Sequence, residues 1–142
     1  MEDNINTLDE LNKGATMGMD AIKFLLDKVK SKKFKKVLEK QYAEYEAISN
    51  KVNEIYEKYS SKKPHETNIV SKMMTWYGIE MKTMVDESDS KIADLLLQGT
   101  NMGIIEGRKL LNNKKVDKDI NKLLDTFVKL QEEYVEILKK YL

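Results

Sequence analysis

The chain has 142 residues, with 25 basic and 24 acidic side chains, one histidine, one proline and no cysteine. A hydrophobic content of 41% with a net charge of +1 excludes a disordered chain, and the lack of cysteine excludes disulfides and zinc–thiolate sites. The longest run without a charged residue, 95–105, is far shorter than the ~18–20 residues of a membrane helix, and the acidic N-terminus is unlike a signal peptide. We therefore expect one cytoplasmic domain, residues 1–142, without membrane contact.

Apolar residues three and four positions apart predict two long helices in the first part of the chain. Thr7 and Glu10 predict a capping box at the start of the first helix, whose apolar stripe runs over 8–29. Ser31 is the predicted N-cap of the second helix, whose stripe runs over 34–59. We expect these two helices to form a helical hairpin.

The segment 61–89 contains the only proline and predicts a crossover that carries one short helix, roughly 67–85. Methionine and aromatic side chains occupy more than one face of this helix, namely Met73, Met74, Trp76, Tyr77, Met81 and Met84. Two interpretations stay open. The helix is either an interaction surface for a second copy of the chain or a protein partner, or a lid buried entirely on its own bundle.

Two further long helices are predicted after the crossover. The first covers 90–112, and Asp117 is the predicted N-cap of the second, whose stripe runs over 120–141. A helix of ~25 residues is about 37 Å long, and the crossover is long enough to return the chain to the far end of such a helix. The pattern predicts an all-α four-helix bundle with one long crossover.

An internal repeat is the most specific signal in the sequence, because residues 11–26 match residues 96–111 at an offset of 85. The matched pairs are Leu11 with Leu96, Gly14 with Gly99, Met17 with Met102, Gly18 with Gly103, Leu25 with Leu110 and Leu26 with Leu111. The helices that follow align at about the same offset. We therefore expect two helical hairpins, 4–60 and 90–142, related by approximate two-fold symmetry.

The six glycines all lie inside helical patterns. A glycine inside a helix costs about 1 kcal/mol relative to alanine, so some other interaction must offset this cost. Small residues four positions apart allow two helix backbones to approach closely. We predict that the first and third long helices cross closely at Gly14, Met17, Gly18, Gly99, Met102 and Gly103.

The two hairpins, the long crossover and the segments LNKGATMGMDAI and QGTNMGII resemble the ferritin-like superfamily. More narrowly, they resemble a bacterial family of ferritin-like four-helix bundles of unknown function. The resemblance covers nearly the whole chain and implies the ferritin-like fold. Its motifs are structural, so it does not imply an activity.

Ferritin-like enzymes hold two metal ions with a Glu on each of two helices and a Glu-x-x-His on each of the other two. The only histidine here, His65, lies in the crossover. The residues that we expect to face the level of Met17 and Met102 are Gln41, Tyr45, Phe127 and Gln131. The resemblance therefore implies that the diiron site is lost, and we expect the glycine-mediated packing to fill its space.

Isolated side chains are the remaining candidates for a metal site. Glu106 is a weak candidate, because it is the acidic residue nearest the predicted crossing but has no companion ligands. Three other glutamates are of the same kind, namely Glu44, Glu46 and Glu132. Met17 and Met102 carry thioethers that can ligate haem or Cu(I), but methionine at helical spacing more often fills a core. We expect no metal and no cofactor.

Two polar features have a structural interpretation. Gln41 and Gln131 lie on or beside apolar stripes, and we expect them to form buried hydrogen bonds with each other or with Tyr45. The lysines of KVKSKKFKK surround the predicted turn between the first and second helices. We interpret them as a solvated bundle end, because the total charge is balanced and Arg108 is the only arginine. We expect no nucleic-acid partner.

The sequence does not identify a biochemical function. Our leading hypothesis is a non-enzymatic ferritin-like bundle that acts by protein–protein association through the crossover helix, as a homodimer or with another protein. The alternative hypothesis is a residual metal-binding or redox protein of the ferritin-like type.

Overall fold

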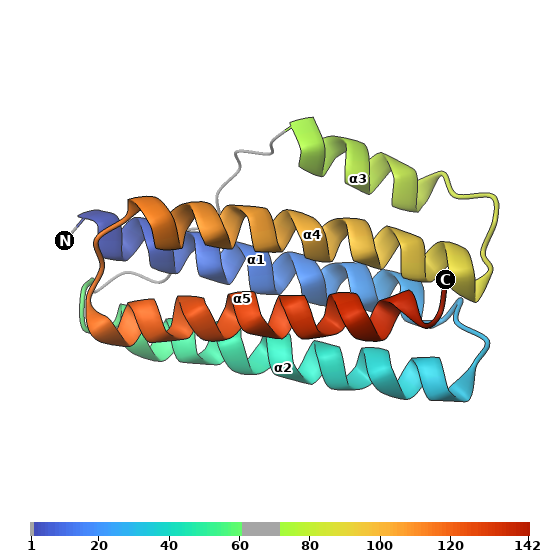
Figure 1. The fold of residues 1–142 in the computed structure, drawn as a ribbon, viewed down its shortest axis with the longest axis horizontal. Coiled ribbons are helices and arrows are strands. Elements are labelled where there is room, and N and C mark those ends of the chain that lie inside the picture. Colours follow the sequence, from blue (N-terminus) through green and yellow to red (C-terminus); the bar gives the residue numbers. More distant parts are fainter. Residues whose placement is uncertain (1, 61–71) are drawn as a thin grey trace.

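The computed structural model describes residues 2–60 and 72–142, with the side chains of 72–74 excepted. The described residues form five helices and no strand: α1 (Glu2–Leu26), α2 (Lys32–Tyr56), α3 (Lys72–Lys82), α4 (Asp89–Asn113) and α5 (Lys118–Lys139). The four long helices pack side by side, and α3 lies outside them along α4 (Figure 1). The prediction of an all-α bundle is confirmed.

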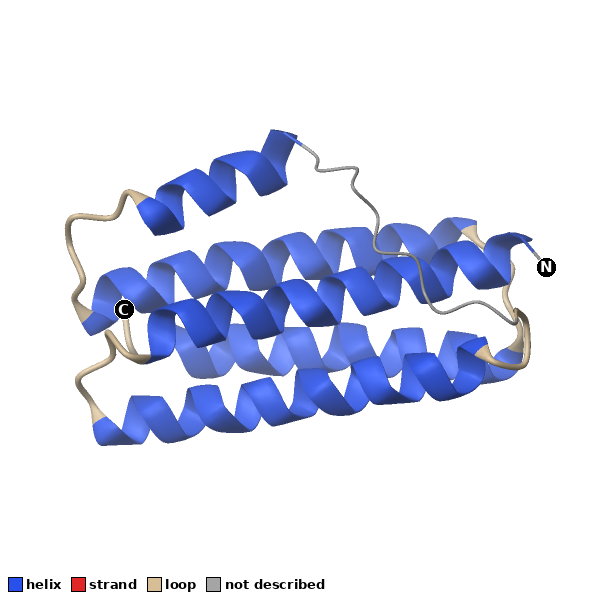
Figure 2. Ribbon diagram, turned by 180° about the vertical axis from the view of Figure 1, so that it is seen from behind, coloured by secondary structure: helices blue, strands red, loops and turns tan. Residues whose placement is uncertain are grey.

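The directions of the long helices follow from Figure 1. α1 and α5 run one way along the bundle, and α2 and α4 run the opposite way. α1 packs mainly on α2, and α4 packs mainly on α5. Since α2 and α4 are parallel, the chain must return along the bundle between them, and α3 lies in that connection (Figure 2). None of the described helices is long and apolar enough to cross a membrane.

The core consists of the predicted apolar stripes. Representative side chains that are fully or almost fully buried are Leu8, Leu25, Phe34, Leu38, Ile120 and Leu138. Burial of one such side chain stabilises the fold by about 1.5–3 kcal/mol relative to its exposure. The bundle is therefore held together mainly by its stripes, and the polar residues inside it require a separate explanation.

Two of the predicted N-caps are confirmed. The Ser31 hydroxyl accepts a hydrogen bond from the backbone N–H of Phe34, at 3.2 Å, and Asp117 is the N-cap residue of α5. The Asp117 carboxylate makes no capping bond and instead accepts one from the Tyr59 hydroxyl, at 2.7 Å. This contact joins the end of the first hairpin to the second.

The predicted start of the first helix is wrong, because α1 begins at Glu2 and Thr7 is buried within it. Tertiary contacts account for the additional turn. Asn4 Oδ1 accepts a hydrogen bond from the backbone N–H of Asp117, at 2.9 Å, and Asp3 forms an ion pair with Lys114 at 3.7 Å. A capping pattern depends on neighbouring residues only, so it cannot predict these contacts with the distant turn between α4 and α5.

Asp89 makes the corresponding contact at the opposite end of the bundle. Its two carboxylate oxygens accept hydrogen bonds from the backbone N–H groups of Lys30, at 2.8 Å, and Ser31, at 3.0 Å. Asp89 is also the first residue of α4, where a negative charge is favoured by the helix dipole. One side chain therefore fixes the α1–α2 turn against the start of the second hairpin.

The crossover helix ends earlier than predicted and is divided between core and solvent. α3 ends at Lys82, and the predicted segment 67–71 and the side chains of Met73 and Met74 lie outside the described residues. Tyr77 is only 5% exposed, whereas Trp76 is 50% exposed. Two other side chains of the predicted surface, Met81 and Met84, are partly buried against the core. The predicted interaction surface is thus wrong for Tyr77, which packs on the bundle.

Candidate functional site

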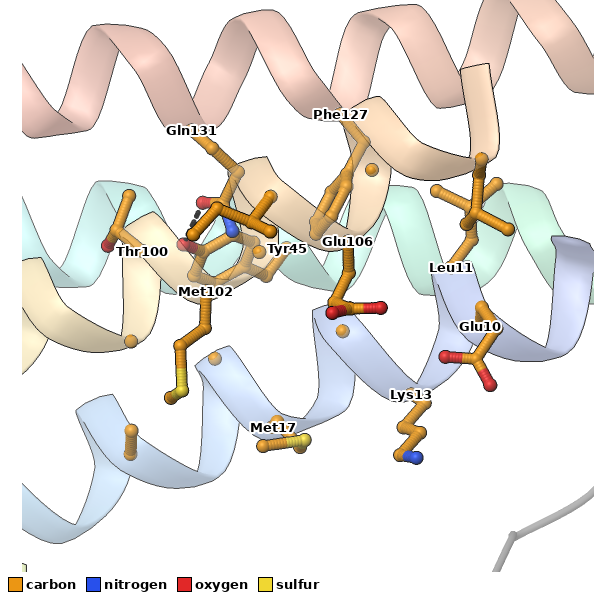
Figure 3. A pocket seen from close by; sticks show the side chains of 18 of the residues that line it. Glu10, Leu11, Lys13, Met17, Tyr45, Thr100, Met102, Glu106, Phe127 and Gln131 are labelled. Carbon is orange, nitrogen blue, oxygen red and sulfur yellow. Dashed lines mark hydrogen bonds between the residues drawn. The ribbon is translucent and has the colours of Figure 1, made fainter. Parts of the chain in front are cut away.

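A cavity of about 310 Å³ opens between α1 and α4 at the middle of the bundle (Figure 3). α1 and α4 form its walls, α2 contributes Gln41 and Tyr45, α5 contributes Phe127 and Gln131, and α3 contributes Tyr77. Small-molecule sites in proteins generally occupy about 300–1,000 Å³. The expectation that helix packing fills this space is therefore wrong.

The glycines create the cavity region by accommodating side chains from other helices. The glycines and the side chains that lie over them are Gly14 under Phe127, Gly18 under Tyr45, Gly99 under Tyr77, Gly103 under Gln131 and Gly107 under Val128. A Cβ atom added at Gly18 would lie 2.5 Å from the Tyr45 ring, which is closer than real Cβ contacts. Gly78 has no such neighbour within 4 Å.

These contacts give the glycines a packing role different from the predicted close backbone crossing between α1 and α4, which stays a prediction. The atoms nearest to the five glycines belong to side chains of α2, α3 and α5, and not to the backbone of the opposite glycine-bearing helix. Met17 and Met102 line the cavity from opposite walls and do not close it (Figure 3).

A buried hydrogen-bonded chain crosses the inner side of the cavity. Gln41 Nε2 donates to the Tyr45 hydroxyl oxygen, at 2.9 Å, and the Tyr45 hydroxyl donates to Gln131 Oε1. Gln41, Tyr45 and Gln131 are each no more than 3% exposed. The prediction that the two glutamines bond with Tyr45 is confirmed, and the chain links the two hairpins across the core.

Burial controls the ionisation of the tyrosines at the cavity. It raises the pKa of Tyr45 to about 12, and the hydrogen bond from Gln41 opposes this shift. Burial likewise raises the pKa of Tyr77, with a further contribution from the nearby Tyr45. Both hydroxyls are therefore protonated near neutral pH. They can bind a ligand by hydrogen bonding, but a phenolate base is not formed there.

One fully buried polar atom beside the cavity has no partner among the described residues. Gln41 is 1% exposed and lines the cavity, and its Oε1 forms no hydrogen bond with any described residue. A buried acceptor without a partner costs about 1–3 kcal/mol.

Apolar groups dominate the rest of the lining, and the charges lie at the mouth. Met17, Met102 and Phe127 contribute thioether and aromatic surface. Glu106 is 63% exposed in its side chain and forms an ion pair with Lys109 at 3.5 Å. The interior therefore suits an apolar molecule.

The candidate metal ligands are not brought together. Within residues 2–60 and 72–142, no group of three His, Asp or Glu side chains is placed to hold a metal ion, and His65 lies outside this part of the chain. Glu132 forms an ion pair with Arg108 at 2.7 Å, and Glu44 lies beside the Tyr134 hydroxyl. The amide, phenol and thioether groups at the cavity do not fit two iron ions, which favour carboxylate and imidazole ligands.

The structure brings together the six residues predicted to share one level of the bundle. Those residues, which all line the cavity, are Met17, Gln41, Tyr45, Met102, Phe127 and Gln131. Thr100 and Tyr77 also line the cavity, although they were not predicted to do so. A buried threonine inside α4 was a possible signal for the first, whereas nothing in the sequence separates Tyr77 from the adjacent Trp76.

Searches of protein-family models, curated proteins and solved structures found no match to this chain. The ferritin-like resemblance therefore stays a prediction from sequence motifs. The chemistry of the cavity is the feature that indicates a function.

Proposed function

We propose that the protein is a non-catalytic binding protein for a small apolar molecule, which occupies the cavity between α1 and α4. The observation that carries this proposal is the cavity itself, at about 310 Å³ in the middle of the bundle. Its volume is about twice that of the ~150 Å³ apolar cavity that takes up benzene. A molecule of two fused rings suits this space.

The energetics of the glycines support the proposal. Each helix-interior glycine costs about 1 kcal/mol relative to alanine, and five of them surround the cavity. An alanine at Gly18 or Gly103 would push Tyr45 or Gln131 from its place on the inner side of the cavity. The glycines therefore set the positions of the side chains that border the cavity.

Titration of the full-length chain with neutral one-ring and two-ring molecules tests this function. Calorimetry and thermal unfolding are followed with indole, naphthalene and 2-naphthol, and a ligand of the native state raises the unfolding temperature. We expect binding to be weakened by Met102→Trp, which fills the cavity, and kept by Asn101→Trp on the exposed face of α4. If none of the three probes binds with a Kd below about 1 mM, the proposal is wrong.

Association through the crossover helix is a second candidate. We propose that the outer face of α3 contacts a second copy of the chain or another protein. Trp76 and Ile79 support this, since they are 50% and 54% exposed on the same short helix. Sedimentation at rising concentration, compared between the native chain and Trp76→Ser with Ile79→Ser, tests the homodimer. A monomer at every concentration contradicts it.

We further propose that the bundle is ferritin-like and that its two hairpins are repeats. The parallel α2 and α4 with one long connection support the first statement. Equivalent contacts support the second. Gly18 lies under Tyr45 and Gly103 lies under Gln131. The two glycines are 85 positions apart, and the two residues above them are 86 positions apart.

The ends of the bundle repeat the same relation. The Asn4 side chain accepts from the backbone N–H of Asp117, and the Asp89 side chain accepts from that of Ser31. The two acceptors are 85 positions apart, and the two N-cap residues are 86 positions apart. An ancestral pair of identical hairpins would give this arrangement of contacts.

A further inference from the structure

Two polar atoms of the cavity lining are hydrogen-bond donors that no described residue uses. Gln131 Oε1 accepts from the Tyr45 hydroxyl, whereas Gln131 Nε2 forms no hydrogen bond within residues 2–60 and 72–142. The Tyr77 hydroxyl likewise forms none with this part of the chain. Both residues line the cavity and are almost fully buried, at 3% exposed for Gln131 and 5% for Tyr77.

Both donors can be reached from the cavity. Among the described residues, the side-chain polar atoms that lack a partner and also lack accessible surface belong to Thr7, Gln41 and Tyr56. Gln131 Nε2 and the Tyr77 hydroxyl lack a partner but do not belong to this group, so each keeps some accessible surface. Because both side chains line the cavity, a molecule inside it can contact these two atoms.

The two donors lie on the same wall of the cavity. A Cβ atom added at Gly99 would lie 2.8 Å from the Tyr77 hydroxyl oxygen, and one added at Gly103 would collide with Gln131 Nε2. Positions four residues apart on a helix are neighbours, with Cβ atoms about 5–6 Å apart. The hydroxyl of Thr100, between them in sequence, is already used, since it donates to the Leu96 carbonyl at 2.7 Å.

We propose, on the basis of the function proposed above, that the ligand is a neutral two-ring molecule with a carbonyl oxygen that accepts hydrogen bonds from Gln131 Nε2 and the Tyr77 hydroxyl. A carbonyl oxygen has two lone pairs and can accept from both. A hydroxyl can donate or accept, but an amide nitrogen only donates, so an acceptor satisfies the pair. Because burial raises the pKa of Tyr77, its hydroxyl keeps the proton that it donates.

The distribution of charge argues for a neutral carbonyl rather than a carboxylate. The charged residues of the cavity are Glu10, Lys13, Glu106 and Lys109, of both signs. Glu106 and Lys109 pair with each other at the mouth, with side chains 63% and 67% exposed. The inner side has only amide and hydroxyl groups, and a charged ligand group buried there without an opposite charge is strongly disfavoured.

Two naphthalenes of the same shape isolate the carbonyl. 2-Acetylnaphthalene has a C=O group where 2-isopropenylnaphthalene has C=CH2. The ratio of their affinities for the full-length chain, measured by calorimetry, is compared with the ratio of their partition from water into cyclohexane, which offers no donor. We expect the ketone to bind about tenfold or more better, relative to the alkene, than this partition predicts, because one hydrogen bond alone changes affinity by about fivefold.

Two variants assign the effect to the two donors. Tyr77→Phe removes a hydroxyl without a described partner and keeps the ring over Gly99, so we expect it to fold. The ratio of ketone to alkene affinity should fall by about fivefold in Tyr77→Phe and in Gln131→Met. It should be kept in the matched control Tyr42→Phe, which lies outside the cavity. If Gln131→Met does not fold, Tyr77→Phe and the native chain still decide the question.

The outcomes separate this inference from the proposed function. If both probes bind the native chain as their partition predicts, or if either folded cavity variant leaves the ratio unchanged, the cavity binds apolar molecules without recognising the carbonyl as proposed, and the inference is overturned. Tighter binding of 2-naphthoate than of 2-acetylnaphthalene overturns it as well, because the site would then select an anion. If neither neutral probe binds, the proposed function fails with it.

Discussion

The Tyr45 hydroxyl is the group whose removal tests the buried hydrogen-bonded chain most directly. Tyr45→Phe deletes one oxygen and leaves Gln41 Nε2 and Gln131 Oε1 without their partner. A buried polar group that loses its partner costs about 1–3 kcal/mol. Since one side of the chain borders the cavity, where water can replace part of the loss, we expect about 2–4 kcal/mol for the two groups.

Urea unfolding followed by far-ultraviolet circular dichroism measures this loss. In a thermal unfolding experiment on a chain of this size, the same loss of 2–4 kcal/mol in unfolding free energy lowers the Tm by about 6–12 °C. Tyr42→Phe is the matched control, because Tyr42 is on the same helix, half-buried and outside the cavity. If Tyr45→Phe costs no more than Tyr42→Phe, the hydrogen-bonded chain does not stabilise the fold and the reasoning is refuted.

A triple variant checks the mechanism of the loss. Replacing Gln41 and Gln131 with methionine together with Tyr45→Phe removes all the buried polar groups of the chain at once. No donor or acceptor is then left alone, and an apolar replacement of this kind is close to neutral. We therefore expect the triple variant to be more stable than Tyr45→Phe alone. A triple variant that shows the sum of the three single losses contradicts this account.

Three further predictions concern the glycines, alkaline pH and the bundle ends. Gly18→Ala should destabilise the bundle by about 1–2 kcal/mol, because overpacking against the Tyr45 ring exceeds the gain in helix propensity. Gly78→Ala, with open space around it, should not destabilise it, and equal urea midpoints for the two variants would be contrary to this expectation. The pKa of Tyr45 is raised from 10 to about 12, so the unfolded state loses this proton first. Tyr45 alone should therefore contribute a fall of about 1.4 kcal/mol per pH unit in the unfolding free energy between these values, in addition to the other tyrosines with raised pKa values. Tyr45→Phe should show a shallower fall in the same titration, and an unchanged slope would rule out this assignment. Asp89→Ala should lower the unfolding free energy by about 1–2 kcal/mol, because two hydrogen bonds to the α1–α2 turn are lost. Asp125→Ala removes only an exposed ion pair and should lower it by less than about 0.5 kcal/mol. Equal thermal shifts for the two aspartate variants would show that the bond to the turn contributes little.

The fold was predictable because apolar periodicity reports directly which face of a helix is buried. Phe34, Leu38 and Ile120 lie on predicted stripes and are fully buried. The Ser31 cap was also predictable, since a cap depends on residues adjacent in sequence. The start of α1 was not predictable in this way, because it depends on a contact between Asn4 and the distant Asp117.

The polar side of the candidate site was predicted, and its empty space was not. Gln41 and Gln131 stand out as amides on apolar stripes, which signals a buried hydrogen bond. A glycine, in contrast, has no side chain from which its neighbour can be inferred. The positions of Gly14 and Gly18 are compatible with a backbone contact and with a ring lying over them, and only the packing of α2 and α5 decides between the two.

The placement of glycines under the residues of the cavity has a consequence for how such a protein can evolve. At each of the five positions, the exchange of a single base in a glycine codon yields alanine, and the added methyl group displaces one identified neighbour. A change at Gly99 acts on Tyr77 of the crossover helix, while a change at Gly18 acts on Tyr45 inside the bundle. Single-base changes at these positions would thus reshape the cavity one lining side chain at a time.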